Sequence, residues 1–169
     1  VTISGRRESY KTDRPSQSLR LSSPIIETPQ NIQVVTHEVL DNQQIISMSD
    51  GLIRNVSGAV RLEHWGDLYT NISSRGSQIQ AFRNGFNVVN SYWGPLTEDM
   101  SFVDHIEFVK GPAGFMLANG DPSGLYNVVT KKPTGDTQGE VSLTLGRFDL
   151  YRTALDLDGK LSKDGRLLY

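Results

Sequence analysis

The chain has 169 residues, no cysteine, and 17 basic against 19 acidic side chains, which gives a formal net charge of −2 at pH 7. The length fits one domain of ordinary size with a real core. The lack of excess cations argues against a general nucleic-acid binder, and the lack of cysteine excludes disulfides and thiolate metal sites. No apolar run approaches the roughly 18 residues that a membrane-spanning helix needs.

The first third of the chain predicts an entry segment followed by one strand and two helices. Residues 1–24 are mostly polar and predict an extended segment. Residues 31–35 (NIQVV) predict a strand, after which Thr36 is the expected N-cap of a short helix. A second helix is expected to start at Ser49 and to end near Gly58.

Two irregular loops rich in aromatic and polar side chains follow, and a hairpin separates them. The loops are VRLEHWGDLY (60–69) and NSYWGPL (90–96), and they contain both tryptophans of the chain. Between them, the extended arms of QIQAFRNGFNVVN surround Asn84 and Gly85. An Asn-Gly pair in this setting is the strongest short-range signal for a β-hairpin, since both turn positions need a positive φ.

A glycine-rich stretch at 105–133, HIEFVKGPAGFMLANGDPSGLYNVVTKKP, has the outline of a phosphate-binding loop. That site needs its lysine after the last glycine, whereas Lys110 precedes Gly111, and Pro112 lacks a backbone N–H. We therefore predict two strands joined by a tight crossover with the glycines as hinges, and a short helix over 113–117 (AGFML).

The sequence contains no coherent catalytic set. His37, His64 and His105 are scattered, and neither an HExxH nor a GxSxG motif occurs. The adjacent Glu98 and Asp99 are more typical of a solvated loop than of a catalytic pair. The sequence does not predict an enzyme.

The last thirty residues alternate apolar and polar side chains, which is typical of a β-hairpin with two different faces. The segments EVSLTLG and YRTALDLD are separated by a GRFD turn. One face is expected to carry Val141, Leu143, Leu145, Tyr151, Leu155 and Leu157, and the other Ser142, Thr144, Arg152, Asp156 and Asp158. A second turn is expected before the final RLLY.

Five segments in order, namely TPQNIQVVTHEVL, VSGAV, SSRGSQ, RNGF and the glycine-rich stretch, resemble the plug domain of TonB-dependent outer-membrane receptors. TPQNIQVVT resembles the ferric-siderophore receptor branch. The resemblance implies an α+β fold, a small mixed β-sheet with short helices, followed by the first β-hairpin of a transmembrane β-barrel. The implied domains are an extended entry segment (1–24), the plug (25–137) and the first barrel strands (138–169), so the chain resembles a fragment. The family's TonB box is expected upstream of Val1.

The resemblance also implies the site residues. Siderophore contacts are expected from Arg61, His64, Trp65, Tyr69, Tyr92 and Trp93. Plug–barrel contacts with barrel glutamates are expected from Arg75 and Lys110, where Lys110 replaces the family's commoner arginine. The alternative for Trp65 and Trp93 is that they anchor their loops against the domain's own core.

The implied function is the gating and ligand binding of a receptor that imports ferric siderophores into a bacterial cell. Its expected partners are the ferric siderophore, TonB through an upstream segment, the protein's own β-barrel and the outer membrane, where the receptor would reside, with no nucleic acid. No cofactor is expected, because the iron arrives already chelated. The alternatives are another cargo (haem, cobalamin or an oligosaccharide) or a soluble periplasmic binding or adaptor domain.

Overall fold

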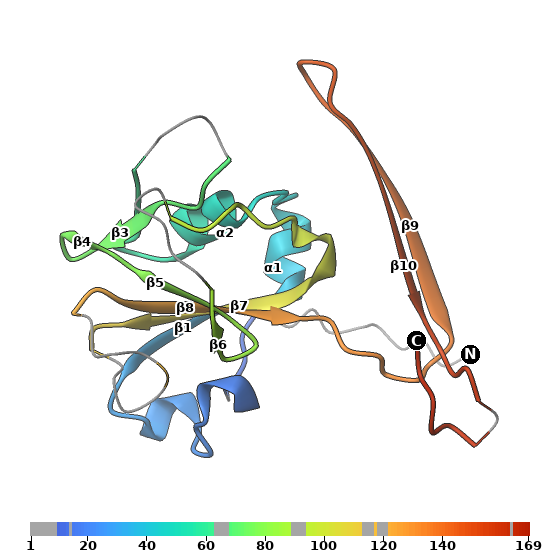
Figure 1. Cartoon of the computed structure of the whole chain (residues 1–169), viewed down its shortest axis with the longest axis horizontal. Helices are drawn as coiled ribbons and strands as arrows, with labels where there is room; N and C mark the ends of the chain where they lie inside the picture. Colours follow the sequence, from blue (N-terminus) through green and yellow to red (C-terminus); the bar gives the residue numbers. More distant parts are fainter. Residues whose placement is uncertain are drawn as a thin grey trace, which may run out of the picture. The chain divides into compact units, whose positions relative to one another are not determined.

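A computed structural model describes residues 10–13, 15–62, 68–88, 94–112, 117, 122–162 and 164–169. The chain divides into two compact units, residues 1–130 and 131–169, each of which is described by itself (Figure 1). Within the described residues, no helix is both long and apolar enough to cross a membrane.

A five-stranded mixed sheet forms the centre of the first unit. Its strand order is β1 (Asn31–Val35), β7 (Val103–Lys110), β8 (Gly124–Thr130), β5 (Gln80–Arg83) and β6 (Phe86–Asn87). β5 and β8 run parallel, and the other neighbouring strands are antiparallel. β8 is buried along nearly its whole length and β7 is buried from Ile106 to Val109, so the two middle strands lie inside the unit.

Two α-helices cover one face of this sheet: α1 (His37–Asn42) and α2 (Met48–Asn55) (Figure 1). Their buried side chains, among them Leu40 and Leu52, join Ile106 and Phe108 of β7 in the larger apolar core. Helix α2 packs closely, because a Cβ added to Gly51 would lie 3.1 Å from the Cδ1 of Ile106. The main apolar core of the unit therefore lies between this face of the sheet and the two helices.

The N-terminal segment covers the opposite face of the sheet, and it contains the two short 3₁₀ helices η1 (Gln17–Leu19) and η2 (Ile25–Glu27) (Figure 1). Leu19 is fully buried against a smaller apolar cluster that includes Phe82, Val109 and Leu125. The described part of the expected extended entry segment is thus packed and locally helical. The burial of Leu19 offsets part of the entropy lost on ordering this segment.

A smaller antiparallel sheet lies beside α2 and consists of β2 (Val60–Arg61), β3 (Ile72–Ser74) and β4 (Ser77–Gln78). The 3₁₀ helix η3 (Met100–Phe102) leads directly into β7.

The helix boundaries differ slightly from those expected. Thr36 occupies the N-cap position of α1, but its hydroxyl makes no capping hydrogen bond. Helix α2 begins at Met48 rather than Ser49, because the hydroxyl of Ser47 accepts a hydrogen bond from the backbone N–H of Asp50 at 3.4 Å. The turn at Asn84 and Gly85 is confirmed, with φ values of 49° and 82°.

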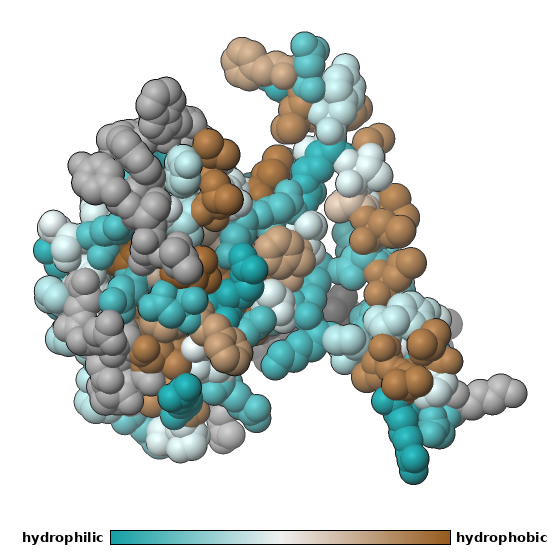
Figure 2. Space-filling view, in the orientation of Figure 1, coloured by the Kyte–Doolittle hydropathy of each residue, from teal (hydrophilic) through white to brown (hydrophobic). Residues whose placement is uncertain are grey.

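The second unit is a long antiparallel hairpin of β9 (Gln138–Leu145) and β10 (Tyr151–Asp158). The register pairs Leu145 with Tyr151 and Val141 with Leu155, so the expected apolar side chains share one exposed face. Figure 2 shows brown, apolar side chains along this hairpin. The other face carries polar groups, among them Asp156, whose carboxylate lies 2.6 Å from the Nζ of Lys131. The two expected faces are confirmed.

Candidate ligand-binding site

The segments that flank the two aromatic loops lie side by side in the first unit. Residues 68–70 and 95–97 run antiparallel, with the N–H of Thr70 donating to the carbonyl of Pro95 at 2.8 Å and the N–H of Thr97 donating to that of Leu68 at 3.0 Å. Tyr69 and Leu96 pair across this contact. The fold therefore brings together the described ends of two loops that are far apart in the sequence, as a shared site requires.

Gly94 makes this approach of the two segments possible. Its φ is +90°, and an added Cβ would lie 2.5 Å from the carbonyl oxygen of Thr70. Any larger residue would meet that backbone and would also be strained. On the same contact, the hydroxyls of Thr70 and Thr97 lie 3.2 Å apart.

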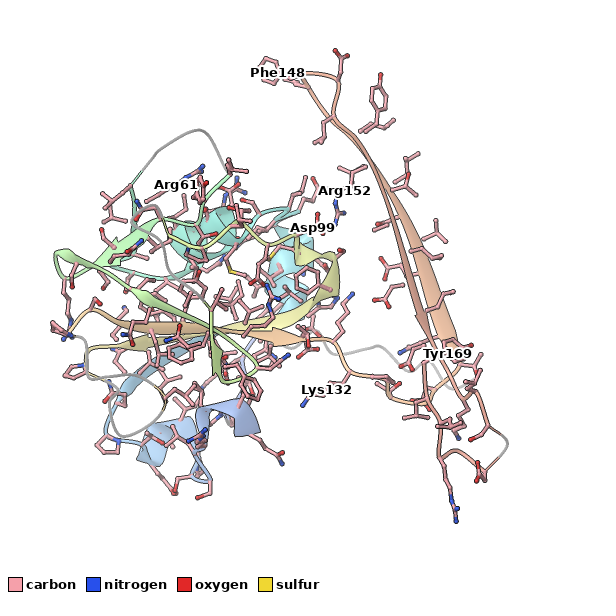
Figure 3. The ribbon with its side chains drawn as sticks, in the orientation of Figure 1. Arg61, Asp99, Lys132, Phe148, Arg152 and Tyr169 are labelled. Carbon is pink, nitrogen blue, oxygen red and sulfur yellow. The ribbon has the colours of Figure 1, made fainter. Side chains whose placement is uncertain are left out.

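Arg61 stands at the other end of the first loop, on β2. Its Nη1 is 4.0 Å from the Oδ1 of Asp50 in the first turn of α2, and Asp50 also forms an ion pair with Arg54 at 3.2 Å. Figure 3 shows Arg61 beside α2. The neighbouring N–H of Leu62 donates to the carbonyl of Asn71 at 2.9 Å, which fixes the strand at the start of the loop.

Exposed aliphatic side chains surround these positions. Their exposed fractions run from 44% to 62%, and they are Val60, Leu62, Leu68 and Leu96. Val60 and Leu62 are the chain neighbours of Arg61, while Leu68 and Leu96 are the chain neighbour and the pairing partner of Tyr69. Loop ends of this composition suit a partly apolar, anionic ligand.

Of the six expected ligand contacts, the structure describes Arg61 and Tyr69, which lie at the two ends of the first loop, and their contact with a ligand stays a prediction. The other four, His64, Trp65, Tyr92 and Trp93, lie outside the described residues, so their roles stay predictions.

The guanidinium of Arg75 lies beside Gly111, the residue that follows Lys110 in the chain. Arg75 occupies the β3–β4 turn with φ +53°, and its Nη1 lies 3.0 Å from the position that a Cβ on Gly111 would take. The carbonyl of Lys110 accepts from the side-chain amide of Gln30 at 2.7 Å, while its ammonium group donates to Ser57 at 2.7 Å. Their role in contacting a barrel stays a prediction.

The glycines of the crossover act as hinges, as expected. Gly111 and Gly124 have φ values of +88° and +101°, and β7 and β8 pair as antiparallel neighbours. A Cβ on Gly124 would lie only 2.0 Å from the carbonyl oxygen of Val109. The short helix expected over 113–117 falls almost entirely outside the described part of the chain.

A buried carboxylate in the middle of the sheet was not expected from the sequence. Glu107 on β7 is fully buried, and its Oε2 accepts from the Nδ2 of Asn127 at 2.8 Å and from the hydroxyl of Ser16 at 2.8 Å. Its Oε1 accepts from the backbone N–H of Ser16 at 2.5 Å and lies 3.6 Å from the Nε2 of His105.

This network keeps both Glu107 and His105 charged at neutral pH. Burial works to raise the pKa of Glu107, but hydrogen bonds from His105, Ser16 and Asn127 outweigh it and hold the pKa below its usual value. Burial likewise works to lower the pKa of His105, yet hydrogen bonds with Asp104 and Glu107 raise that pKa to about 9. The polar Asn127 within the apolar run LYNVV was the available signal, since a buried amide needs partners.

Comparison with known proteins places this mixed sheet, with two short helices on one face, among the plugs of outer-membrane receptors. Residues 24–125 match the family model described as the TonB-dependent receptor plug domain. The chain belongs to the family of TonB-dependent receptor plug domains. The matched relatives are receptors and transporters rather than enzymes.

Three relatives illustrate the match. The ferric-pyoverdine 358 receptor of Pseudomonas putida is 34% identical over 94% of this chain and 20% of that receptor. The metal-pseudopaline receptor CntO of Pseudomonas aeruginosa is 32% identical over 98% of this chain and 23% of the relative. The structure of the pyoverdine outer membrane receptor FpvA of Pseudomonas aeruginosa, bound to pyoverdine, gives a TM-score of 0.80 at 29% identity, over 90% of this chain and 23% of FpvA. The chain thus spans about a fifth of the length of the curated relatives that it matches.

Proposed function

We propose that this chain forms the plug and the first barrel strands of an outer-membrane receptor that binds ferric siderophores and imports them. In this proposal residues 25–137 are the plug and 138–169 are the opening strands of the barrel. The named functions of the relatives, among them ferric-pyoverdine and metal-pseudopaline receptors, support this assignment.

The observation that carries the proposal is the shared base of the two aromatic loops. Backbone pairing between 68–70 and 95–97 holds the loop ends together at Tyr69, and Arg61 lies at the other end of the first loop. A ferric siderophore is a bulky, oxygen-rich chelate. Its ring systems can stack on aromatic side chains, and its anionic groups can pair with a guanidinium.

The remaining parts of the chain have complementary roles in this proposal. The iron arrives inside its chelate, so the protein supplies neither metal ligands nor a resident cofactor. Arg75 and Lys110 pair with carboxylates of the barrel wall, and TonB engages a segment that precedes the plug through added strand pairing. The apolar face of the β9–β10 hairpin contacts lipid, and its polar face lines the barrel interior.

A binding measurement on the complete receptor in detergent tests this proposal. We expect ⁵⁵Fe-labelled siderophore to bind, and Arg61→Ala to raise Kd by about tenfold, since a hydrogen bond to a charged group contributes roughly 1.5–3 kcal/mol. Arg166→Ala, which removes a highly exposed arginine from the second unit, is the matched control and should leave Kd unchanged. Binding of haem, cobalamin or an oligosaccharide, with no ferric siderophore bound, would be consistent with the receptor family but would contradict the proposal that the cargo is a ferric siderophore.

A further inference from the structure

Residues 15–28, here called the strap, cover one face of the five-stranded sheet without joining it by strand pairing. In the described part of the chain, the backbone-to-backbone hydrogen bonds of the strap stay within residues 13–30. Examples are the N–H of Leu19 to the carbonyl of Ser16 and the N–H of Arg20 to that of Gln17. The strap therefore lacks the ladder of hydrogen bonds that makes neighbouring strands cooperative.

Side chains hold the strap on the sheet instead, and most of the polar contacts converge on one carboxylate. Ser16 donates both its N–H and its hydroxyl to Glu107. Asn127 donates from its Nδ2 to the hydroxyl of Ser18 at 2.9 Å and to Glu107 at 2.8 Å. Because Glu107 is ionised and buried, these hydrogen bonds are of the strong, charge-assisted kind.

Apolar side chains and one close backbone approach complete the attachment. Leu19 is buried in a cluster with Ile32, Phe82, Val109 and Leu125, and Leu21 and Ile25 of the strap pack against the same cluster. The carbonyl of Ser18 passes so near the β5–β6 turn that a Cβ on Gly85 would lie 2.8 Å from it. By contrast, Ile26 is 94% exposed and adds nothing to the attachment.

We propose that the strap is a latch: it opens from the sheet as one unit while the sheet stays folded, and the two hydrogen bonds between Ser16 and Glu107 set how often it opens. Opening exposes the carboxylate, the side chain of Asn127 and the pocket of Leu19 together. The attachment is small and side-chain based, so its opening costs far less than separating β7 from β8. Glu107 therefore positions the strap on the sheet.

The proposal is separate from the proposed function, because its test requires no ligand. Hydrogen exchange of the 169-residue chain in detergent at pH 7 follows the backbone amides of Leu19 and Arg20, with those of β8 as the reference. In the native chain, the strap amides should exchange faster than the β8 amides.

Ser16→Pro is the decisive variant. Ser16 already has φ −68°, which proline adopts, and the substitution removes both donors to Glu107. Because the N of Ser16 lies 2.5 Å from the Oε1 of Glu107, the proline ring would also meet that oxygen, and Ser16→Ala, which adds no atoms, isolates the loss of the hydroxyl. We expect exchange at Leu19 and Arg20 to speed up by about tenfold or more, with β8 unchanged. Ser16→Ala removes only the hydroxyl and should give a smaller acceleration. It serves as the test variant if Ser16→Pro does not fold. Ser22→Ala, on an exposed strap serine, is the control and should have no effect.

Three results would overturn the latch. The first is native strap amides that exchange together with those of β8. The second is unchanged rates at Leu19 and Arg20 in both Ser16 variants. The third is equal acceleration of the strap and β8, which would make Ser16 an ordinary contributor to global stability.

Discussion

At the level of single residues, the hydrogen bonds of His105 with Asp104 and Glu107 link the stability of the plug to pH. The pKa of His105, about 9, lies above its ordinary value of 6.5. A group whose pKa is raised by folding stabilises the folded state fully below its unfolded pKa, and that stabilisation is lost as the pH rises through the folded value. The relevant window therefore runs from about pH 6.5 to 9.

We predict that the thermal midpoint of the native chain falls across this window as His105 loses its proton. The loss amounts to at most about 3 kcal/mol, and to less where water screens the pair. In His105→Gln the same scan should be flatter, because no proton is lost at this position. Circular dichroism melts of both proteins at several pH values measure the difference, and parallel profiles would contradict the predicted role of His105.

Glu107 acts in the opposite direction at the acid end. Its pKa is lowered by folding, so its contribution is present above its ordinary value of 4.5 and is lost as the pH falls through the lower, folded value. The network of Glu107, His105, Ser16 and Asn127 is therefore fully charged and bonded near neutral pH.

At the scale of elements, the contact between residues 68–70 and 95–97 depends on a glycine. Gly94→Ala should destabilise the fold, because the added Cβ would need to occupy space within 2.5 Å of the carbonyl of Thr70. Gly58→Ala is a matched control, since Gly58 has a similar positive φ of +80° but no atom within 4 Å of its added Cβ.

We expect Gly58→Ala to cost about 1 kcal/mol through backbone strain alone, and Gly94→Ala to cost about 1–3 kcal/mol more through steric overlap. Urea unfolding followed by circular dichroism gives both values. Equal costs for the two variants would show that the close approach at Gly94 contributes nothing.

Local signals in the sequence predicted much of the fold, and tertiary contacts account for what was missed. Asn84 and Gly85 determine their hairpin turn locally, because few other residue pairs adopt two successive positive φ values. Glu107, in contrast, sits in an alternating strand that looks half-exposed, and only the packing of the strap on that face buries it. No local pattern reveals that Ser16, 91 residues away, supplies its partners.

The same distinction applies to the candidate site. Composition identified the two loops, since both tryptophans of the chain lie in them. Their adjacency follows from the pairing of Tyr69 with Leu96, which is a tertiary contact that the sequence does not state. A role for Arg61 in ligand binding was predicted from the family resemblance. Its ion pair with Asp50 could not be predicted, because it depends on the tertiary packing of β2 beside α2.

At the scale of the first unit, the central sheet separates the candidate site from the strap. Helix α2 and the small sheet of β2, β3 and β4 lie on one face, and η1 and η2 lie on the other (Figure 1). Asn127 lies on the strap face of the sheet, where its Oδ1 accepts from the N–H of Gly85 at the β5–β6 turn and its Nδ2 donates to Ser18 of the strap. This buried amide therefore connects the strap to the β5–β6 turn.

We propose that the chain belongs to a receptor that imports ferric siderophores, and uptake by cells tests this proposal most directly. Cells from which the gene has been deleted, and the same cells with the gene restored, are given a panel of ⁵⁵Fe-labelled siderophores. We predict that uptake of at least one siderophore is lost on deletion and recovered on restoration. Unchanged uptake of every siderophore, with loss of haem, cobalamin or oligosaccharide uptake instead, would contradict the claim.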